Sequence, residues 1–270
     1  MNRFSLARPV LGCVVVLSAY ANAQSSFREE LDAGVRAYKE LKYDEAIRHF
    51  QNATALEPED AAAHSNLAST LTAEYIPGVE EPDNVRLAET AIIEYKKVFE
   101  LNPKSEDSLK GAAYLYLQMK KFRNAKSFYQ RAAELVPDDP ENYYSIGVIN
   151  WTQAFTPRMK LRDKLGLKPE EPLPILYAGC WELKESNAPI VEEGIAALAK
   201  AIDLQPEYDD AMAYMNLLYR ERAEIQCGDS AARAADLEAA DHWVDLTLSS
   251  KQAKAEKSRR AQSGTAKDKQ

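Results

Sequence analysis

Two stretches of the chain share one spacing of small, aromatic and proline positions. In each stretch, a small residue is followed by a second small residue after 12 positions, an aromatic residue after 4 more, an alanine after 3 more and a proline after 5 more. The two copies are Gly34, Ala46, Phe50, Ala53, Pro58 and Ala113, Ala125, Tyr129, Ala132, Pro137. We interpret each copy as a pair of antiparallel helices, because small residues let two backbones approach and proline ends the second helix.

Interrupted copies of the same pattern fill the rest of the chain. The second-helix half recurs twice, at Ala91, Tyr95, Val98, Pro103 and at Gly194, Leu198, Ala201, Pro206. The prolines at 58, 103, 137 and 206 are separated by 45, 34 and 69 residues, so one repeat contains 11 extra residues and another contains 35. A degenerate fifth copy begins at Met212 and lacks the final proline, as expected for an end repeat that faces water.

This 34-residue pattern resembles the tetratricopeptide repeat (TPR). The resemblance covers about residues 27–250 and implies an all-α fold, a right-handed solenoid of about five helical hairpins with a long helical and proline-rich insertion in the fourth. The expected organisation is a signal peptide at 1–23, the solenoid at 24–250 and a tail at 251–270. The expected repeats are 27–60, 61–105, 106–139, 140–208 and 209–250, with insertions at about 76–86, 155–188 and 224–234.

All three insertions fall between the first and second helix of a repeat, so we expect them along one edge of the solenoid. In the longest, Thr156-Pro157 predicts a helix start and Gly166 predicts a helix stop. The segment 168–174 is expected to be extended and polyproline-like, and 177–184 to form a short helix. Insertions of this length are usually functional or disordered, and Trp181 favours an ordered flap.

The first 23 residues are typical of a secretory signal. Two arginines precede an apolar stretch over 10–19, and Ala21-Asn22-Ala23 matches a small-x-small cleavage site. We therefore expect cleavage before Gln24 and export, either to the periplasm or as a secreted protein. Ten apolar residues are too few to span a bilayer, so no integral membrane span is expected once the signal is removed. Lipid attachment at Cys13 is a weaker alternative, because the preceding residues resemble a bacterial lipobox only loosely.

Charge and composition narrow the class of partner. The net charge of −8 includes +2 from the predicted signal and +5 from residues 251–270, which leaves −15 on residues 24–250. Such an acidic body repels phosphate backbones, so nucleic acid is not an expected partner. The basic tail contains few apolar residues and is expected to be disordered. Only 10 of the 270 residues are glycine, which agrees with a helical chain.

Cys180 and Cys227 lie in the insertions of the fourth and fifth predicted repeats. The repeats are adjacent and their insertions share an edge, and export would place both residues in an oxidising compartment. A disulfide between them is therefore one interpretation. Two buried free thiols that act as small hydrophobic side chains are the other.

The TPR resemblance implies that the first helices of the repeats line a concave, peptide-binding face. Projecting this face onto the sequence gives a candidate groove rich in aromatic residues, which together with arginine dominate binding hot spots. Its members are Val35, Tyr38, Lys110, Tyr114, Leu117, Tyr144, Trp151 and Arg220. The alternative for each is simple packing against a neighbouring helix, above all for Trp151, which adjoins the long insertion.

One TPR subclass clamps the C-terminal carboxylate of heat-shock chaperones through lysine, asparagine and arginine, and this sequence matches it poorly. The corresponding positions hold Leu31, Val35, Asp107 and Gly111, and only Asn66 fits. Export from the cytosol argues against this subclass as well.

Motifs of catalysis and of metal or cofactor binding are missing from the sequence. There is no G-x-S-x-G, P-loop, G-x-G-x-x-G or H-E-x-x-H pattern, and His49, His64 and His242 have no second ligand at metal-binding spacing. We therefore predict no enzymatic activity, no cofactor and no metal. The predicted function is an exported adaptor that binds a protein or peptide segment in the groove. The alternative is a structural subunit of an envelope complex that uses its outer surface and insertion edge.

Overall fold

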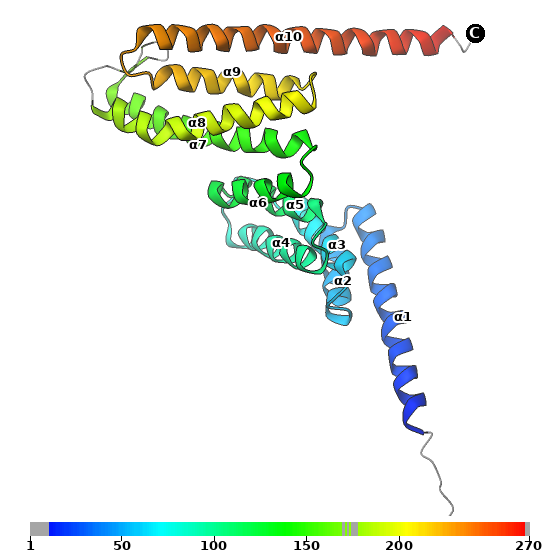
Figure 1. Ribbon diagram of the computed structural model, residues 1–270. Coiled ribbons are helices and arrows are strands. Elements are labelled where there is room, and N and C mark those ends of the chain that lie inside the picture. Colours follow the sequence, from blue (N-terminus) through cyan, green and yellow to red (C-terminus); the bar gives the residue numbers. More distant parts are fainter. Residues whose placement is uncertain (1–10, 169–170, 172, 174–177, 268–270) are drawn as a thin grey trace, which may run out of the picture. The chain divides into compact units, whose positions relative to one another are not determined.

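The computed structural model describes residues 11–168, 171, 173 and 178–267, and every regular element in this part of the chain is an α-helix (Figure 1). The helices are α1 (Leu11–Lys39), α2 (Tyr43–Leu56), α3 (Ala61–Glu74), α4 (Pro82–Leu101), α5 (Glu106–Gln118), α6 (Phe122–Leu135), α7 (Pro140–Leu165), α8 (Ala178–Leu204), α9 (Asp209–Glu224) and α10 (Ser230–Lys267). The all-α fold class predicted from the sequence is confirmed.

Several helices begin where the sequence supplies a side-chain acceptor or a proline. The Asp60 carboxylate accepts a hydrogen bond from the backbone amide of Ala63 at the start of α3, and Ser105 caps α5 in the same way. Such caps stabilise a helix by about 1 kcal/mol. Pro82 and Pro140 are the first residues of α4 and α7, where a missing N–H breaks no helical hydrogen bond.

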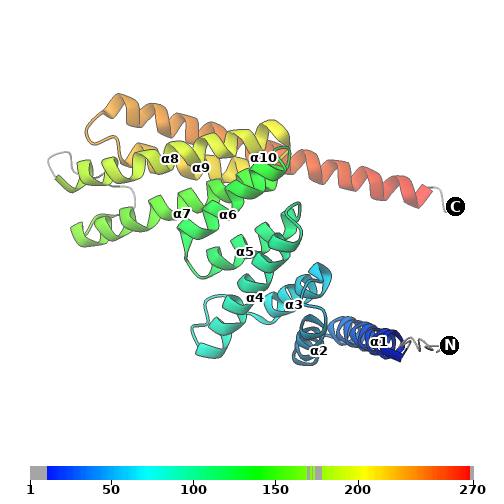
Figure 2. The same ribbon diagram turned by 60° about the horizontal axis from the view of Figure 1, so that its bottom comes forward.

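The chain forms two compact units, residues 1–119 and 120–270. In the first unit α1 packs on α2, α2 on α3, α3 on α4 and α4 on α5. In the second unit α6 packs on α7, α7 on α8, α8 on α9 and α9 on α10, and α7 also contacts α9 (Figure 2). Helices that follow one another in the sequence therefore lie side by side, as in stacked hairpins. The predicted third repeat, 106–139, is divided between the units, with α5 in the first and α6 in the second.

The small positions of the repeat pattern lie where helices touch. In the first unit, a Cβ atom at Gly34 would lie 2.6 Å from the ring of Phe50 in α2, closer than van der Waals contact allows. In the second unit, a Cβ atom at Gly147 would lie 2.5 Å from Leu198 in α8. Both large side chains are buried. Each glycine and its large neighbour together set the spacing of their helices, as the sequence pattern predicts.

The long insertion lengthens α7 instead of starting a new helix. The helix continues through Pro157 to Leu165, so the predicted helix start at Pro157 is wrong. Beyond Pro157, Arg158 and Arg162 pair with glutamates of α9, which holds this extension against the rest of the second unit. The predicted stop at Gly166 is confirmed, and its φ of 65° lies in the left-handed region that favours glycine.

The other half of the long insertion lengthens α8. The short helix expected over 177–184 is instead the first part of α8, which begins at Ala178 and continues through Pro189 to Leu204. The predicted flap is thus built mainly from two extended helices. Most of the segment 168–174, expected to be extended, lies outside the described residues.

The two shorter insertions are likewise divided between a loop and a longer helix. The one at 76–86 forms a loop that ends where α4 begins at Pro82. The one at 224–234 contains the turn between the end of α9 and the start of α10 at Ser230.

The ends of the chain are helical as far as the structure describes them. Helix α1 runs across the predicted cleavage site at residue 23 without a break. Helix α10 extends past the end of α9 to Lys267 (Figure 1), so the disorder expected for the tail is wrong over 251–267. Alanine, lysine and glutamate are strong helix formers, and Lys254 and Lys257 pair with Asp209 and Glu207 beside the start of α9. Among the described helices, none combines the length and apolar character needed to cross a membrane.

Candidate protein-binding surface

The eight predicted groove residues are divided between the two units. Val35 and Tyr38 lie on α1, and Lys110, Tyr114 and Leu117 lie on α5, all in the first unit. Tyr144 and Trp151 lie on α7 and Arg220 lies on α9, in the second unit. The two sets are therefore described separately.

In the first unit the predicted residues are accessible but take part in local contacts. Tyr38 and Tyr114 are each 39% exposed. The Tyr38 ring packs against Tyr43, with centroids 5.6 Å apart. The Lys110 ammonium lies 3.8 Å from Glu106, one turn earlier on α5. Val35 and Leu117 are half-buried.

In the second unit the structure assembles a continuous row of rings that we call the aromatic stripe: Tyr144, Trp151, Phe155, Tyr208 and Tyr214. Successive ring centroids lie 5.0 Å (Tyr208–Tyr144), 5.7 Å (Tyr144–Tyr214), 5.5 Å (Tyr214–Trp151) and 5.0 Å (Trp151–Phe155) apart. These distances are within the range of favourable aromatic pairs. All five side chains are half-buried, so each ring is held by its neighbours while part of it remains accessible.

Helical periodicity explains why α7 contributes three of these rings. Residues 144, 151 and 155 are separated by seven and four positions, which places them on one face of the helix. The Arg158 guanidinium extends the row, because it lies 5.2 Å from the Phe155 ring centroid. Tyr214 comes from α9, which contacts α7, and Tyr208 comes from the turn that precedes α9.

Three members of the stripe are missing from the predicted groove. Phe155 follows Trp151 by four residues on the same helix, so extending the helical face by one turn would have found it. On α9 the predicted member is Arg220, whereas the ring that contacts Tyr144 and Trp151 of α7 is Tyr214, six positions earlier. Tyr208 precedes α9, and no helical periodicity predicts its place.

The phenols at one end of the stripe are poorly hydrated. Burial raises the pKa of Tyr144 to about 12, with smaller contributions from the charges of Asp210 and Glu141. Burial also raises the pKa of Tyr208, whose hydroxyl donates a hydrogen bond of 2.5 Å to the Glu141 carboxylate. Both phenols are therefore neutral hydrogen-bond donors at any physiological pH.

Arg220 is engaged away from the rings. Its guanidinium donates to Asn216 on α9 and to Asp241 on α10, at 2.8 and 2.7 Å. The structure therefore assigns Arg220 to the contact between α9 and α10. Trp151, which could have been buried beneath the insertion, is half-buried within the stripe.

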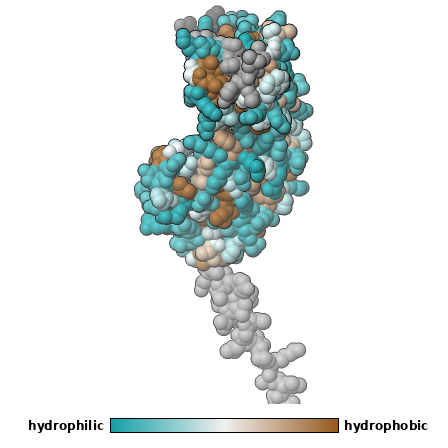
Figure 3. Space-filling model, turned by 90° about the vertical axis from the view of Figure 1, so that its left-hand side faces the viewer, coloured by the Kyte–Doolittle hydropathy of each residue, from teal (hydrophilic) through white to brown (hydrophobic). Residues whose placement is uncertain are grey.

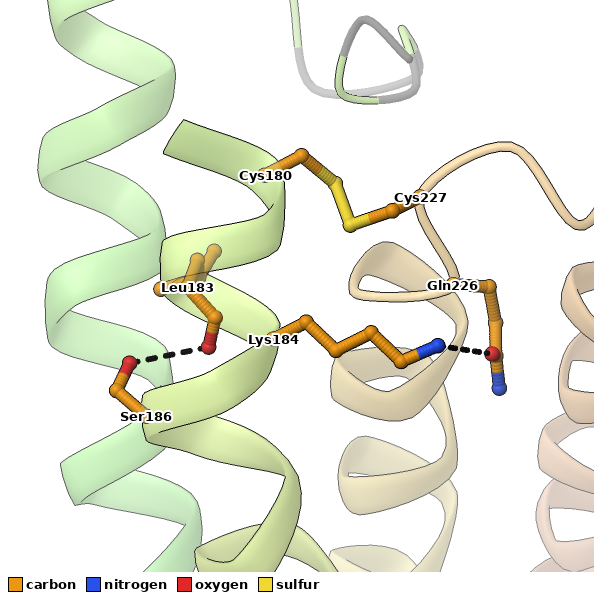
Figure 4. Close-up of a disulfide and its surroundings, with 6 residues drawn as sticks. All are labelled: Cys180, Leu183, Lys184, Ser186, Gln226 and Cys227. Atoms are coloured by element: carbon orange, nitrogen blue, oxygen red, sulfur yellow. Dashed lines mark hydrogen bonds between the residues drawn. A yellow bond between two sulfur atoms is a disulfide. The ribbon is translucent and has the colours of Figure 1, made fainter. Parts of the chain in front are cut away.

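A disulfide joins Cys180 at the start of α8 to Cys227 in the turn between α9 and α10 (Figure 4). Both cysteines are buried. Close by, the Lys184 ammonium lies 3.5 Å from Gln226 (Figure 4). In the second unit, the insertions of the fourth and fifth predicted repeats thus lie at the same end. Figure 3 views this end, where separate apolar patches lie among mostly hydrophilic side chains; Trp181, beside the disulfide, is 54% exposed.

Ion pairs hold the extended end of α7 against α9. The Arg158 guanidinium makes two hydrogen bonds to Glu221, of 2.6 and 2.8 Å, and the Glu221 side chain is only 3% exposed. Arg162 donates to Glu224 over 2.7 Å. Burial raises the pKa of Glu221, and Arg158 opposes this shift. The pair fixes the orientation of two helices at a cost in desolvation, which is the usual balance for buried charges.

The described residues contain no cluster of three or more side chains able to hold a metal ion. His49 lies 2.7 Å from Glu30, and His64 contacts the Glu94 carboxylate and the Pro58 carbonyl. His64 is buried, so it packs as expected and also bridges α3 and α4 through a hydrogen bond. Both histidines thus take part in contacts that join neighbouring helices.

Comparisons with known proteins agree with this architecture. A family model described as tetratricopeptide repeat matches residues 111–139. The chain is 33% identical over 115 residues to Hsp70-Hsp90 organizing protein 2 of Arabidopsis thaliana. That match covers 42% of this chain and 18% of the relative, so the chain corresponds to less than a fifth of that protein's length.

Solved structures are similar over most of the chain. A crystal structure of MamA protein has a TM-score of 0.58 at 17% identity, covering 86% of this chain and 96% of that one. The structure of MamA, residues 41 to the end, from Desulfovibrio magneticus RS-1 has a TM-score of 0.54 at 16% identity, covering 83% and 96%. At these identities the likeness shows the fold, a stack of helical hairpins.

Proposed function

We propose that this chain, whose residues 111–139 match the tetratricopeptide-repeat model and whose helices form stacked hairpins, is a non-enzymatic scaffold that binds a protein segment along the aromatic stripe of the second unit. Folds of this kind supply extended surfaces on which binding residues are mounted. The function must therefore be argued from the residues on the surface, not from the fold itself.

The observation that carries the proposal is the continuous stripe of five half-buried rings. A row of aromatic side chains offers a large apolar contact area on rigid side chains, which is the composition of binding hot spots. The rings are supported from behind by α9 and by each other, so little conformational entropy remains to be lost when a partner binds.

The proposal includes a place of action outside the cytoplasm, in the periplasm or as a secreted protein. The apolar stretch at 10–19 and the cleavage motif ending at Ala23 support export, and the Cys180–Cys227 disulfide suits an oxidising compartment. N-terminal sequencing of protein recovered from the periplasm or medium should begin at Gln24. An intact N-terminus on protein found only in the cytoplasm would contradict this part of the proposal.

Peptide selection from a displayed random library, with the full chain as bait, tests the binding function. The substitution Trp151→Ala should lower the affinity of the chain for the selected peptides by about 30-fold or more, as expected for a hot-spot tryptophan. Trp181→Ala is the matched control, because this exposed tryptophan directly follows Cys180 in the sequence, and it should leave their affinity unchanged. Circular dichroism checks that both variants are folded.

Unchanged peptide affinity in Trp151→Ala would favour the alternative function, a structural subunit of an envelope complex. If Trp151→Ala leaves every selected peptide bound as tightly as before, the stripe is not the binding surface. Binding would then depend on the outer surface or on the insertions, where Trp181 lies.

A further inference from the structure

We propose that the aromatic stripe selects a cationic partner, namely a segment that carries lysine or arginine beside apolar side chains. This inference rests on the proposed function and adds the chemistry of its ligand.

Two exposed carboxylates flank the rings at one end of the stripe. Glu141 lies in the first turn of α7, three residues before Tyr144, and Asp210 lies in the first turn of α9, two residues after Tyr208. Both carboxylates are close enough for their charge to raise the pKa of both phenols. A ligand that reaches Tyr144 therefore enters a field of negative charge.

The rings favour a positive charge for a second reason. The face of an aromatic ring is electronegative, and a lysine or arginine placed over it gains about 0.5–1 kcal/mol at an exposed site and about 2 kcal/mol when desolvated. The chain already uses this interaction at the other end of the stripe, where Arg158 lies over Phe155. It does so again on α9, where the Arg222 guanidinium lies 4.6 Å from the Tyr219 centroid.

The turn that holds Tyr208 already binds basic side chains supplied by the chain itself. Lys257 of α10 pairs with Glu207 at 2.5 Å, and Lys254 pairs with Asp209. These residues lie on both sides of Tyr208 in the sequence. Lysine side chains thus pair with carboxylates next to the stripe, although these two carboxylates are already neutralised within the chain.

The net charge of the second unit leaves the preference to the carboxylates beside the rings. Residues 120–270 contain 24 aspartates and glutamates and 22 lysines and arginines, a net charge of −2, so long-range attraction contributes little. An acidic segment would bring its carboxylates close to Glu141 and Asp210. The ligand expected here is thus opposite in charge to the one that a lysine and arginine clamp would hold.

Three synthetic peptides of equal length test this inference with the full chain. They share the same leucine and phenylalanine positions and differ only at the intervening positions, which are all lysine, all glutamine or all glutamate. Fluorescence anisotropy at low and at physiological salt should show the lysine peptide binding about tenfold more tightly than the glutamine peptide. The glutamate peptide should bind most weakly.

A charge variant shows whether the preference arises at the stripe. In Glu141→Gln/Asp210→Asn the ratio between the affinities of the lysine and glutamine peptides should fall to about threefold or less. The matched control is Glu182→Gln/Glu185→Gln, which removes two exposed carboxylates of α8 near the disulfide and should keep the full preference.

The outcomes separate the two proposals. If Trp151→Ala abolishes binding of all three peptides while wild type binds lysine and glutamate peptides equally, the stripe binds segments but the inference about charge is overturned. A preference for the glutamate peptide overturns it as well. If Trp151→Ala changes the binding of none of the three, the proposed function of the stripe itself fails.

Discussion

The disulfide between Cys180 and Cys227 should stabilise the second unit by an amount that depends on the number of residues between the two cysteines. The two residues are 47 positions apart, and a cross-link across that distance removes conformational entropy from the unfolded chain. In the loop-entropy treatment the stabilisation is about 4 kcal/mol. Replacing both cysteines by alanine should therefore lower the unfolding free energy of the second unit by about this amount.

The positions of the tryptophans make the measurement specific to that unit. Trp151, Trp181 and Trp243 all lie in residues 120–270, so tryptophan fluorescence follows the second unit, whereas far-ultraviolet circular dichroism follows the helices of both. With a urea m-value of about 2 kcal/mol/M, the fluorescence midpoint should fall by about 2 M in Cys180→Ala/Cys227→Ala. The part of the circular dichroism transition that belongs to the first unit is the internal control and should not move.

Thiol titration of the unfolded, unreduced protein provides an independent check. Cys13 is the third cysteine of the chain, so the full chain should show one reactive thiol, and a chain that begins at Gln24 should show none. Three thiols in the full chain, or an unchanged fluorescence midpoint after reduction, would refute the reasoning. Either result would favour the interpretation of Cys180 and Cys227 as buried free thiols.

Two further predictions concern ion pairs of the second unit. Arg158→Met leaves Glu221 buried without its partner and should lower the unfolding free energy of that unit by about 3–5 kcal/mol. Adding Glu221→Met should recover most of the loss. Equal destabilisation of the single and double variants in urea unfolding would count against this prediction. Lys254 lowers the pKa of Asp209 below its ordinary value, so the stability from this pair is present at neutral pH and is lost as pH falls through the lowered pKa. Amide hydrogen exchange in residues 251–260 should therefore accelerate selectively in acid, and the acceleration should be absent in Asp209→Asn.

The hairpin architecture could be predicted from the sequence because it depends on contacts that recur with the repeat. Gly34 and Phe50 are 16 residues apart, and the structure places them in direct contact. The continuation of α7 through Pro157 could not be predicted in this way. Proline locally disfavours a helix by about 3 kcal/mol, whereas the ion pair that holds the extension joins Arg158 to Glu221 on α9, 63 residues later. No local pattern shows such a contact.

The candidate site could be predicted only as far as it depends on the periodicity of a single helix. Tyr144 and Trp151 follow from the periodicity of one helix. Tyr208 and Tyr214 join them only through the packing of α9 on α7, which the periodicity of a single helix does not show. The basic tail was misjudged because its composition suits both a disordered segment and a helix, and the carboxylates that hold it, Glu207 and Asp209, lie more than 40 residues earlier.

The contact between Gly147 and Leu198 has a consequence for how this protein can evolve. The two side chains share a single volume, since a Cβ atom at the first position would lie 2.5 Å from the second. A homologue with alanine at position 147 can preserve the helix spacing only if position 198 becomes smaller. The two positions should therefore covary across an alignment of relatives, with their summed side-chain volume varying less than either volume alone.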